Sequence, residues 1–576
     1  MILPKDLRAL TQAALDLIDQ CNNTRGQRAA SYRHYGMWIE SGQARQSPGG
    51  PANYLALANM LYSHVDRLAS HLFSPTDLHF GIDFENHYAK PFLDRAAVAA
   101  RVLSREWEAN DIDIDFGHAV KEALYYGVSI PKLVPKVVAD DDIRITTEIV
   151  MPWNFGVLNE AFNGLDRQEA VCETLYINQH EVWRHIRNMP DAARLWRRIW
   201  EHSRREGNAS LPQSFMHQVL STAIIDTQGR NATRPGGIVN LGNLPTYGAM
   251  GPSIAIDLFP MYELNVRDDE RGDDWTTIQI IEPDIMITPD TNFRKNLFCN
   301  GHLPYGIVQP NVQKGYFWGR SEVVDLMQLQ DWLSEHLNDV RRLLEMQVEK
   351  FLGFQGVDAI TDEIYAQMRR PGYVSVPQGA QIQDLTPAFP PEMIPMVQTI
   401  LSLMDRVSGF PPIMSGQGEP GVRAGTHADQ LMKTGSPRLR DRSVLVERQC
   451  ASLADTTLAC LREKDGRSYW VNPEDEFDNF KLIDLPDDYR VSVDSHSGSP
   501  IYHDDHANLI AWGVQHQILG PEDAIEDLPF SHKETKMQRM RERAQQRQQM
   551  IQQHPEILES RQGLRAVQGG GGGRRR

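Results

Sequence analysis

The chain has 576 residues, of which 41% are hydrophobic, so it can hold several ordinary domains or form one large subunit. Its net charge is −17, from 59 Lys and Arg against 76 Asp and Glu, which argues against a protein that grips nucleic acid by neutralising phosphates. Such acidity suits simple solubility, and it also suits a surface past which DNA slides without sticking.

Cysteine usage and apolar runs bear on the compartment. Five scattered cysteines without a CxxC pair indicate reduced thiols in a cytosolic setting, not a disulfide framework or a zinc site. The N-terminal "MILPKDLRAL" lacks the apolar core of a signal peptide, and no run of ~18 apolar residues predicts a membrane span. We therefore expect the protein in the cytoplasm where it is made, or in a particle assembled there.

Helices are predicted first along the chain, and strands follow. Apolar residues at helical spacing predict helices near residues 10–17, 55–72, 96–109 and 115–126. The β-branched stretch "GVSIPKLVPKVVADDDIRITTEIV" predicts two strands around a turn at residues 140–142. Helix returns from "QHEVWRHIRN" to "SFMHQVL", and a strand hairpin is predicted around the acidic turn "RDDERGDD".

The most regular helix follows the aromatic segment "GYFWGRS" at residues 315–321. Ser321 is predicted as its N-cap, with Glu322 in the first turn. A one-sided apolar stripe of this length cannot be buried by the helix alone and needs neighbouring protein. The stripe comprises Val323, Leu326, Leu333, Leu337, Val340, Leu344, Val348 and Phe351.

Shorter elements complete the chain. A strand module over residues 353–387, a helix over 391–407 and a Gly/Pro-rich loop over 409–425 are predicted in that order. A further helical stretch over 426–463 should kink or break at Pro437. The strands "SYWVNP" and "DYRVSVDS" precede a polar helical end and the flexible basic tail "GGGGGRRR".

Catalytic motifs are not legible in the sequence. GxxxxGK[ST], GxSxG and HExxH do not occur. The carboxylates of "YHDDH" at 502–506 and of "RDDERGDD" at 267–274 would be the candidates for a metal-dependent hydrolase or nuclease. The first spacing places its groups on no single helix or strand face, and the second lacks the EF-hand pattern. We therefore expect that the protein is not an enzyme and that it binds neither a cofactor nor a metal ion.

Four segments and their order carry a resemblance to a known family. They are "EALYYGVSIPKLV", "MPWNFGV", "GYFWGRSEVVDLMQLQDWLSEHLNDV" and "SGFPPIMSGQGEPGVRAGTHADQLM". In this order, over residues 53–552, the chain resembles the portal protein, or head-to-tail connector, of tailed double-stranded DNA bacteriophages. The strand module between the two helices is short for that family, and the first 50 residues and the basic tail align with nothing in it.

The resemblance implies an α+β, mainly helical fold with a wing, stem, clip and crown, assembled as a ring with an axial channel. The ring, commonly of twelve subunits, would sit at one capsid vertex of the virion after assembly in the host cytoplasm. It would bind the major capsid protein, the terminase packaging motor and head-completion or tail adaptor proteins, and double-stranded DNA would pass through it. Another head-tail structural component is the remaining alternative. The implied parts are the N-terminal region and wing (1–318), first stem helix (319–352), clip (353–387), second stem helix (388–408), tunnel loop (409–425), long kinked helix and wing strands (426–498), crown (499–552) and flexible basic tail (553–576).

The resemblance also assigns roles to residues. The stem residues Leu326, Leu333, Leu337, Val340 and Leu344 would pack partly across a subunit boundary. In the clip, Tyr373, Val374 and Val376 would form a strand that pairs with a neighbouring subunit or the motor, or else with residues 381–384 of its own chain. The tunnel-loop residues facing DNA would be Gly409, Ser415, Gln417, Glu419 and Arg423, although Arg423 could instead pair locally with Glu419 or Asp429.

The C-terminal end of the chain is basic. Residues 531–576 carry 11 Lys and Arg against 4 Asp and Glu, a net charge of +7. This charge predicts weak, salt-sensitive contact with packaged DNA, or else a solvated helix with a disordered tail.

Overall fold

The structure is a computed structural model, and it describes residues 4, 6–22, 59–75, 78–86, 90–139, 142–206, 238–240, 255–268, 274–287, 296–299, 301–348, 352–355, 381–384, 388–408, 437–471, 479–493 and 514–515. The protein is α+β, as expected, with more residues in helices than in strands. The chain divides into two compact units, Met1–Pro75 with His79–Val493, and Thr76–Leu78 with Asp494–Arg576. All helices and strands given below belong to the first unit.

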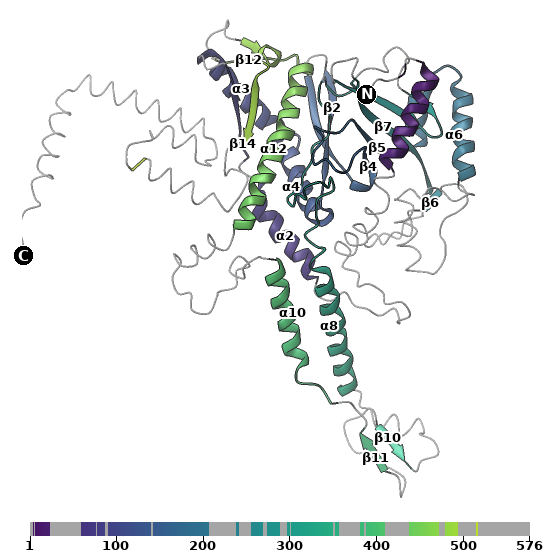
Figure 1. Ribbon diagram of the computed structural model, residues 1–576, viewed down its shortest axis with the longest axis vertical. Helices are drawn as coiled ribbons and strands as arrows, with labels where there is room; N and C mark the ends of the chain where they lie inside the picture. The colour runs from purple at the N-terminus through teal and green to yellow at the C-terminus, as the bar shows by residue number, and fades with distance from the viewer. Residues whose placement is uncertain are drawn as a thin grey trace, which may run out of the picture. The chain divides into compact units, whose positions relative to one another are not determined.

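The largest sheet among the described residues is antiparallel and has six strands, β4 to β9 (Figure 1). Its strand order is β4-β5-β7-β8-β9, and β6 pairs with β7. The predicted hairpin around the acidic turn is confirmed, because β7 and β8 pair in register as far as Asp268 and Asp274. The strands are β4 (Phe155–Val157), β5 (Ala170–Asn178), β6 (Ile238–Asn240), β7 (Ala255–Asp268), β8 (Asp274–Ile281) and β9 (Ile285–Met286).

Side chains of alternating direction along these strands build the cores on the sheet. Ala170 and Cys172 of β5 pack with a helix over residues 7–22, whereas Val171 joins a separate core with Phe317 and Trp318. The helices α5 (Gln179–Ile186) and α6 (Ala192–Glu206) bury Val182, Ile186 and Ile199 against β7, β8 and β9. Each apolar face predicted by periodicity here has a partner.

The predicted strand–turn–strand is also confirmed, as β2 (Ile130–Ala139) paired with β3 (Asp142–Val150). The helices α4 (Ile112–Tyr126) and α12 (Pro437–Lys464) pack against it, and α2 (Met60–Leu72) and α3 (Lys90–Ala109) pack against α4. The described helix α12 begins at Pro437, where the missing N–H costs no hydrogen bond, and the predicted helical residues 426–436 before it lie outside the described residues.

Four further strands form two pairs, and the sequence predicted only part of them. The segment β1 (Phe80–Phe84) pairs with β14 (Tyr489–Val493), and β12 (Ser468–Trp470) pairs with β13 (Asn479–Lys481). The sequence predicted β12 and β14 but neither partner.

Within the described ranges, no helix has an apolar stretch long enough to cross a membrane.

Two helices and a hairpin follow the sheet in sequence. They are α8 (Met327–Val348), β10 (Leu352–Gln355), β11 (Gln381–Asp384) and α10 (Met393–Ser408). The strands β10 and β11 are antiparallel partners, and α8 packs against α10 (Figure 1). Residues 381–384 thus pair with 352–355, while the predicted strand around Tyr373, Val374 and Val376 lies outside the described residues.

The start of α8 differs from the prediction. The α-helix begins at Met327, six residues after the predicted N-cap Ser321. The Ser321 hydroxyl donates to the Tyr125 carbonyl at the end of α4, and it accepts from the Val323 backbone N–H at 3.2 Å. The Ser321 hydroxyl is bonded to a carbonyl of another helix and fixes the chain before α8, so the helix starts only after a turn at residues 322–326.

Candidate functional site

The candidate site is the pair of helices α8 and α10, called here the helix pair. The His336 ring nitrogen Nε2 lies 2.8 Å from the Met393 carbonyl oxygen, so α10 begins beside the middle of α8. Both helices meet the β10–β11 hairpin through short connections, and they therefore run in opposite directions (Figure 1). The half of α8 nearest the hairpin extends beyond the first residue of α10.

The apolar stripe of α8 changes its exposure along the helix. Leu326 and Leu333 are buried, at 2% and 1% exposed, whereas Leu337 and Val340 are half-buried and Leu344 is 51% exposed. At about 100° per residue, the last four of these lie on one face of the helix. The predicted stripe is therefore confirmed over the described residues, but its first part is buried within the chain's own fold and Leu344, toward its far end, is exposed.

Other apolar side chains of the helix pair are also exposed. Trp332 is 39% exposed on α8, and Ile394 and Val407 are 59% and 43% exposed on α10. Sequence reasoning missed all three because it followed a single stripe. Trp332 precedes Leu333 and so lies about 100° away from the stripe. The signal that could have found it is a tryptophan on the otherwise polar flank of an amphipathic helix.

Aromatic residues of the segment "GYFWGRS" fix the chain before α8. Phe317 is fully buried and stacks on Phe155 of β4 with ring centroids 6.4 Å apart. The Trp318 ring meets Phe317 edge-on at 5.1 Å, and its Nε1 donates to Glu160 Oε1 at 2.6 Å. Gly319 has φ +65°, and a Cβ there would lie 2.5 Å from the Gly127 carbonyl oxygen, so no larger residue fits. The start of α8 is thereby packed against the sheet.

A buried charge cluster holds the same junction. Glu322 Oε2 lies 2.8 Å from Arg442 of α12, and Oε1 lies 3.7 Å from His64 of α2. The side chains of Glu322 and Arg442 are each only 6% exposed. Burial alone would raise the pKa of Glu322, but His64 and Arg442 outweigh it and lower the pKa to about 2. The carboxylate stays ionised and joins three helices.

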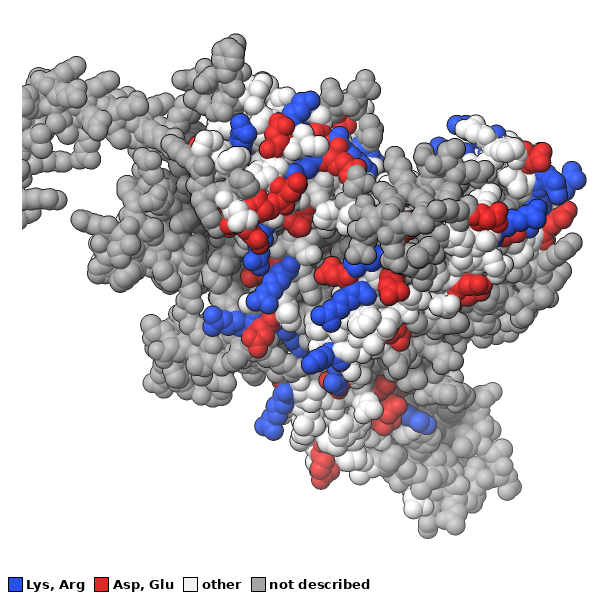
Figure 2. All heavy atoms as spheres, turned by 45° about the horizontal axis from the view of Figure 1, so that its top comes forward, with Lys and Arg blue, Asp and Glu red and all other residues white. Residues whose placement is uncertain are grey.

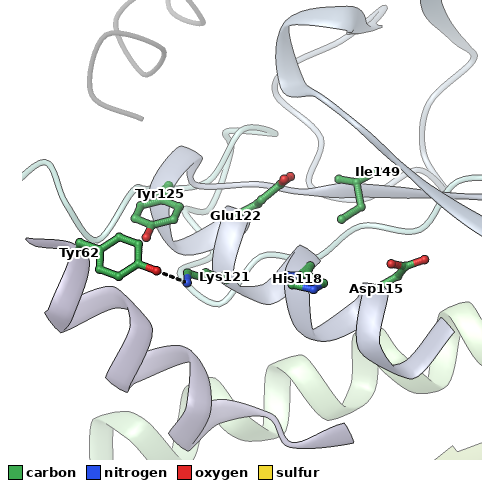
Figure 3. Close-up of a pocket in the computed structure, with 7 residues that line it drawn as sticks. All are labelled: Tyr62, Asp115, His118, Lys121, Glu122, Tyr125 and Ile149. Atoms are coloured by element: carbon green, nitrogen blue, oxygen red, sulfur yellow. Dashed lines mark hydrogen bonds between the residues drawn. The ribbon is translucent and has the colours of Figure 1, made fainter. Parts of the chain in front are cut away.

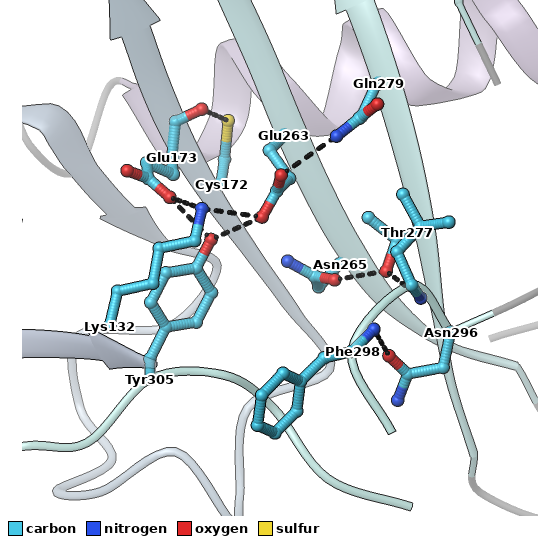
Figure 4. Close-up of polar contacts among 11 residues, drawn as sticks. Lys132, Cys172, Glu173, Glu263, Asn265, Thr277, Gln279, Asn296, Phe298 and Tyr305 are labelled. Atoms are coloured by element: carbon cyan, nitrogen blue, oxygen red, sulfur yellow. Dashed lines mark hydrogen bonds and ion pairs between the residues drawn. The ribbon is translucent and has the colours of Figure 1, made fainter. Parts of the chain in front are cut away.

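A second buried network lies between the sheet and the β2–β3 hairpin (Figure 4). The Lys132 ammonium lies 2.6 Å from Glu173 and 3.0 Å from Glu263, and the Tyr305 hydroxyl donates to both carboxylates. Burial raises the pKa of Glu173, whereas for Glu263 the Lys132 charge and hydrogen bonds outweigh burial and lower the pKa. Because these groups are buried among strands, they serve to hold β2, β5 and β7 together.

A pocket of about 390 Å³ lies between α2, α4 and β3 (Figure 3). Its Lys121 ammonium is paired with Asp66 at 2.7 Å and lies 4.7 Å from the Tyr62 ring centroid. Burial raises the pKa of Asp115. The lining residues are Tyr62, Asp115, His118, Lys121, Glu122, Tyr125 and Ile149, a mixture of both charges with two aromatic rings.

Charges are interspersed over the face seen in Figure 2, where basic and acidic side chains alternate on the described residues. The helix pair shows the same mixture, with Arg341 bound to Glu345 one turn later at 2.8 Å. Among the residues that the structure describes, no group of three or more His, Cys, Asp or Glu is placed to hold a metal ion.

Several predicted site residues lie outside the described residues. They are the tunnel-loop residues Gly409, Ser415, Gln417, Glu419 and Arg423, the clip residues Tyr373, Val374 and Val376, the "YHDDH" cluster at 502–506, and the basic end at 531–576. Of "RDDERGDD", Asp268 is fully buried at the end of β7, and residues 269–273 lie outside the described part.

No protein-family model matches the sequence, and no curated protein matches it.

Proposed function

We propose that the chain is the subunit of a portal ring, a structural component at one vertex of a bacteriophage capsid that forms the channel for DNA packaging and ejection. The observation that carries this proposal is the helix pair, whose apolar side chains remain open between the sheet and the β10–β11 hairpin. The order of helix, hairpin and returning helix is the order of stem, clip and stem in the family that the sequence resembles.

The distribution of the exposed residues favours a ring over a two-fold dimer. A cyclic ring of more than two subunits uses two different surfaces on each subunit, whereas a two-fold dimer uses one surface twice. Trp332 and Leu344 are both exposed on α8, and at about 100° per residue they lie some 120° apart around it. A subunit in a ring contacts one neighbouring subunit on each side, and two separate exposed apolar positions on α8 can serve these two contacts.

The remaining parts of the proposal rest on the resemblance. The hairpin would dock the terminase motor and the tail adaptors, and the major capsid protein would surround the ring. DNA would contact residues 409–425, with Arg423 supplying one ring of positive charge. The net negative charge of the chain would repel phosphates and so keep their contact with the channel transient.

The test is the size of the assembled protein. The full-length chain should form rings with an axial channel in electron-microscopy images and a mass near that of twelve subunits by light scattering. Leu344→Asp and Trp332→Asp should each reduce ring yield at least tenfold, because either charge would be buried in an interface. Ile483→Asp is the matched control, since Ile483 is 57% exposed but lies outside the helix pair, and it should assemble normally.

Other outcomes would contradict the proposal. Monomers or dimers at all concentrations would favour the alternative of an enzyme, and assemblies without a channel would favour another head-tail component. Normal rings from both Asp variants would remove the helix pair from the interface.

A further inference from the structure

Residues 298–299 and 301–309 lie along α12 in antiparallel order. The Gln309 backbone N–H donates to the Gln449 side chain at 2.8 Å, and Leu453 is so close to Gly306 that a Cβ there would come within 2.9 Å of it. Toward the other end, the Lys464 ammonium lies 5.7 Å from the Phe298 ring centroid. As residue numbers fall on the segment they rise on α12, and this register places Cys299 opposite Cys460.

The side chains of Cys299 and Cys460 contact each other, as this register implies. Both cysteines are free and buried, at 1% and 0% exposed, and their side chains are hydrogen-bond partners. The Asn296 side chain holds the Cys299 end of the segment, because its amide donates to the Cys299 and His302 carbonyls (Figure 4 shows Asn296 and Phe298). The Cys299 sulfur is thus held beside α12 and is not on a free loop.

We propose that Cys299 and Cys460 form an oxidisable dithiol, which a peroxide converts to an intramolecular disulfide. One sulfur attacks the peroxide O–O bond and becomes a sulfenic acid, and one water is released. The other thiol then attacks this sulfur, the S–S bond forms, and a second water leaves. Two thiols lose two electrons and two protons in all, and the peroxide is reduced to two waters.

Cys460 is the better first nucleophile. Its hydrogen bond with Cys299 lowers the pKa of Cys460 against the opposing effect of burial, and Lys464 lowers it further. The thiolate is the reactive form, so oxidation should begin at this sulfur. Because the two cysteines are far apart in sequence, the disulfide would close a long loop of the unfolded chain and stabilise the folded subunit. This inference does not depend on ring assembly.

The experiment uses the full chain treated with hydrogen peroxide, quenched by alkylation in denaturant and mapped by mass spectrometry. Three of the five cysteines should remain alkylatable, and one peptide pair should join residues 299 and 460. The midpoint of thermal unfolding should rise by several degrees and return to its starting value with dithiothreitol. A dithiol peptide in the same tube confirms that the oxidant is active.

Serine variants test which cysteines form the disulfide. Cys299→Ser and Cys460→Ser should each abolish both the cross-link and the thermal shift, while Cys450→Ser, a buried cysteine on the same helix, should keep them. Mapping of the unmodified chain needs no variant, so a serine variant that fails to fold leaves the test intact. Five alkylatable cysteines beside an oxidised control peptide, a linkage to Cys450, or a cross-link without a thermal shift would overturn the proposal.

Discussion

At the scale of single residues, Glu322 shows how a buried charge is kept. It lies before α8 with Arg442 at 2.8 Å, and both side chains are nearly inaccessible to water. Taking two charges out of water is costly, so a pair of this kind adds little net stability, but removing one partner leaves the other charge buried alone. The pair therefore fixes where α8, α12 and α2 meet.

Glu322→Gln should lower the free energy of unfolding by about 3–5 kcal/mol, because Arg442 stays buried without a counter-charge. Asp325→Asn is the control. Its partner Arg320 is 58% exposed and Asp325 is 46% exposed, so its loss should cost less than about 1 kcal/mol. Urea denaturation of both variants gives the comparison. Equal losses would show that the buried pair does not hold the junction.

The pH dependence of stability has a definite sign at the same residue. The pKa of Glu322 is lowered to about 2 in the folded state, against about 4.3 in an unfolded chain. A depressed pKa contributes stability that is present above the unfolded value and lost as pH falls toward the folded value. Stability should therefore fall between about pH 5 and pH 2, and Glu322→Gln should flatten that part of the curve. An unchanged slope in the variant would contradict this assignment.

The two glutamates around Lys132 should respond differently to substitution. Burial raises the pKa of Glu173, whereas the Lys132 charge together with hydrogen bonds lowers the pKa of Glu263, so Glu263 stays ionised to a lower pH than Glu173. Glu263→Gln should therefore cost more stability than Glu173→Gln at neutral pH, because it removes the carboxylate that holds its charge more firmly. Parallel thermal or urea unfolding of the two isosteric variants measures this difference. The reverse order would contradict the lowered pKa of Glu263.

At the scale of elements, α8 combines two kinds of packing on one apolar face. Leu333 is 1% exposed and Leu344 is 51% exposed, although the sequence pattern treats them alike. Leu333→Ala should cost the isolated subunit about 2–5 kcal/mol, whereas Leu344→Ala should cost less than about 0.5 kcal/mol. Denaturation at concentrations below assembly separates these effects from ring stability. A large loss for Leu344→Ala would place it in the subunit core.

Local patterns predicted the elements whose partners are close in sequence. The β2–β3 and β7–β8 hairpins each carry their own turn, and helices α2, α4 and α5 each show a clear apolar stripe. The strand β1 was missed because its partner β14 lies at the far end of the described chain, and no local signal marks a pairing of that range. Ser321 was misread for a related reason, since its hydroxyl bonds to α4 and not to its own helix.

The candidate site could be predicted only in part. The stripe gave Leu337, Val340 and Leu344, but it could not tell that Leu326 and Leu333 are buried within the subunit. Periodicity reports that a face is apolar, not which neighbour covers it. The charge cluster of Glu322, His64 and Arg442 was out of reach, because its members come from three distant segments.

At the scale of the whole molecule, the kind of contact on the helix pair would set how the proposed ring responds to salt. The exposed groups named for the interface are apolar, and burial of apolar surface is not weakened by salt, whereas exposed ion pairs are screened. Rings should therefore persist when sodium chloride is raised from about 0.15 M to 1 M. Sedimentation at both salt concentrations tests this. Dissociation at high salt would show that charged contacts hold the subunits together.

The pairing of β1 with β14 has a consequence for synthesis on the ribosome. Phe80, Ile82 and Phe84 of β1 are buried in the finished protein, but Tyr489–Val493 is translated some four hundred residues later. During that interval the nascent chain carries an apolar strand whose hydrogen-bonding edge has no partner, a state prone to wrong pairing. A chain that is released from the ribosome before Val493 therefore lacks β14, and the edge of its β1 strand stays open to pairing with other chains.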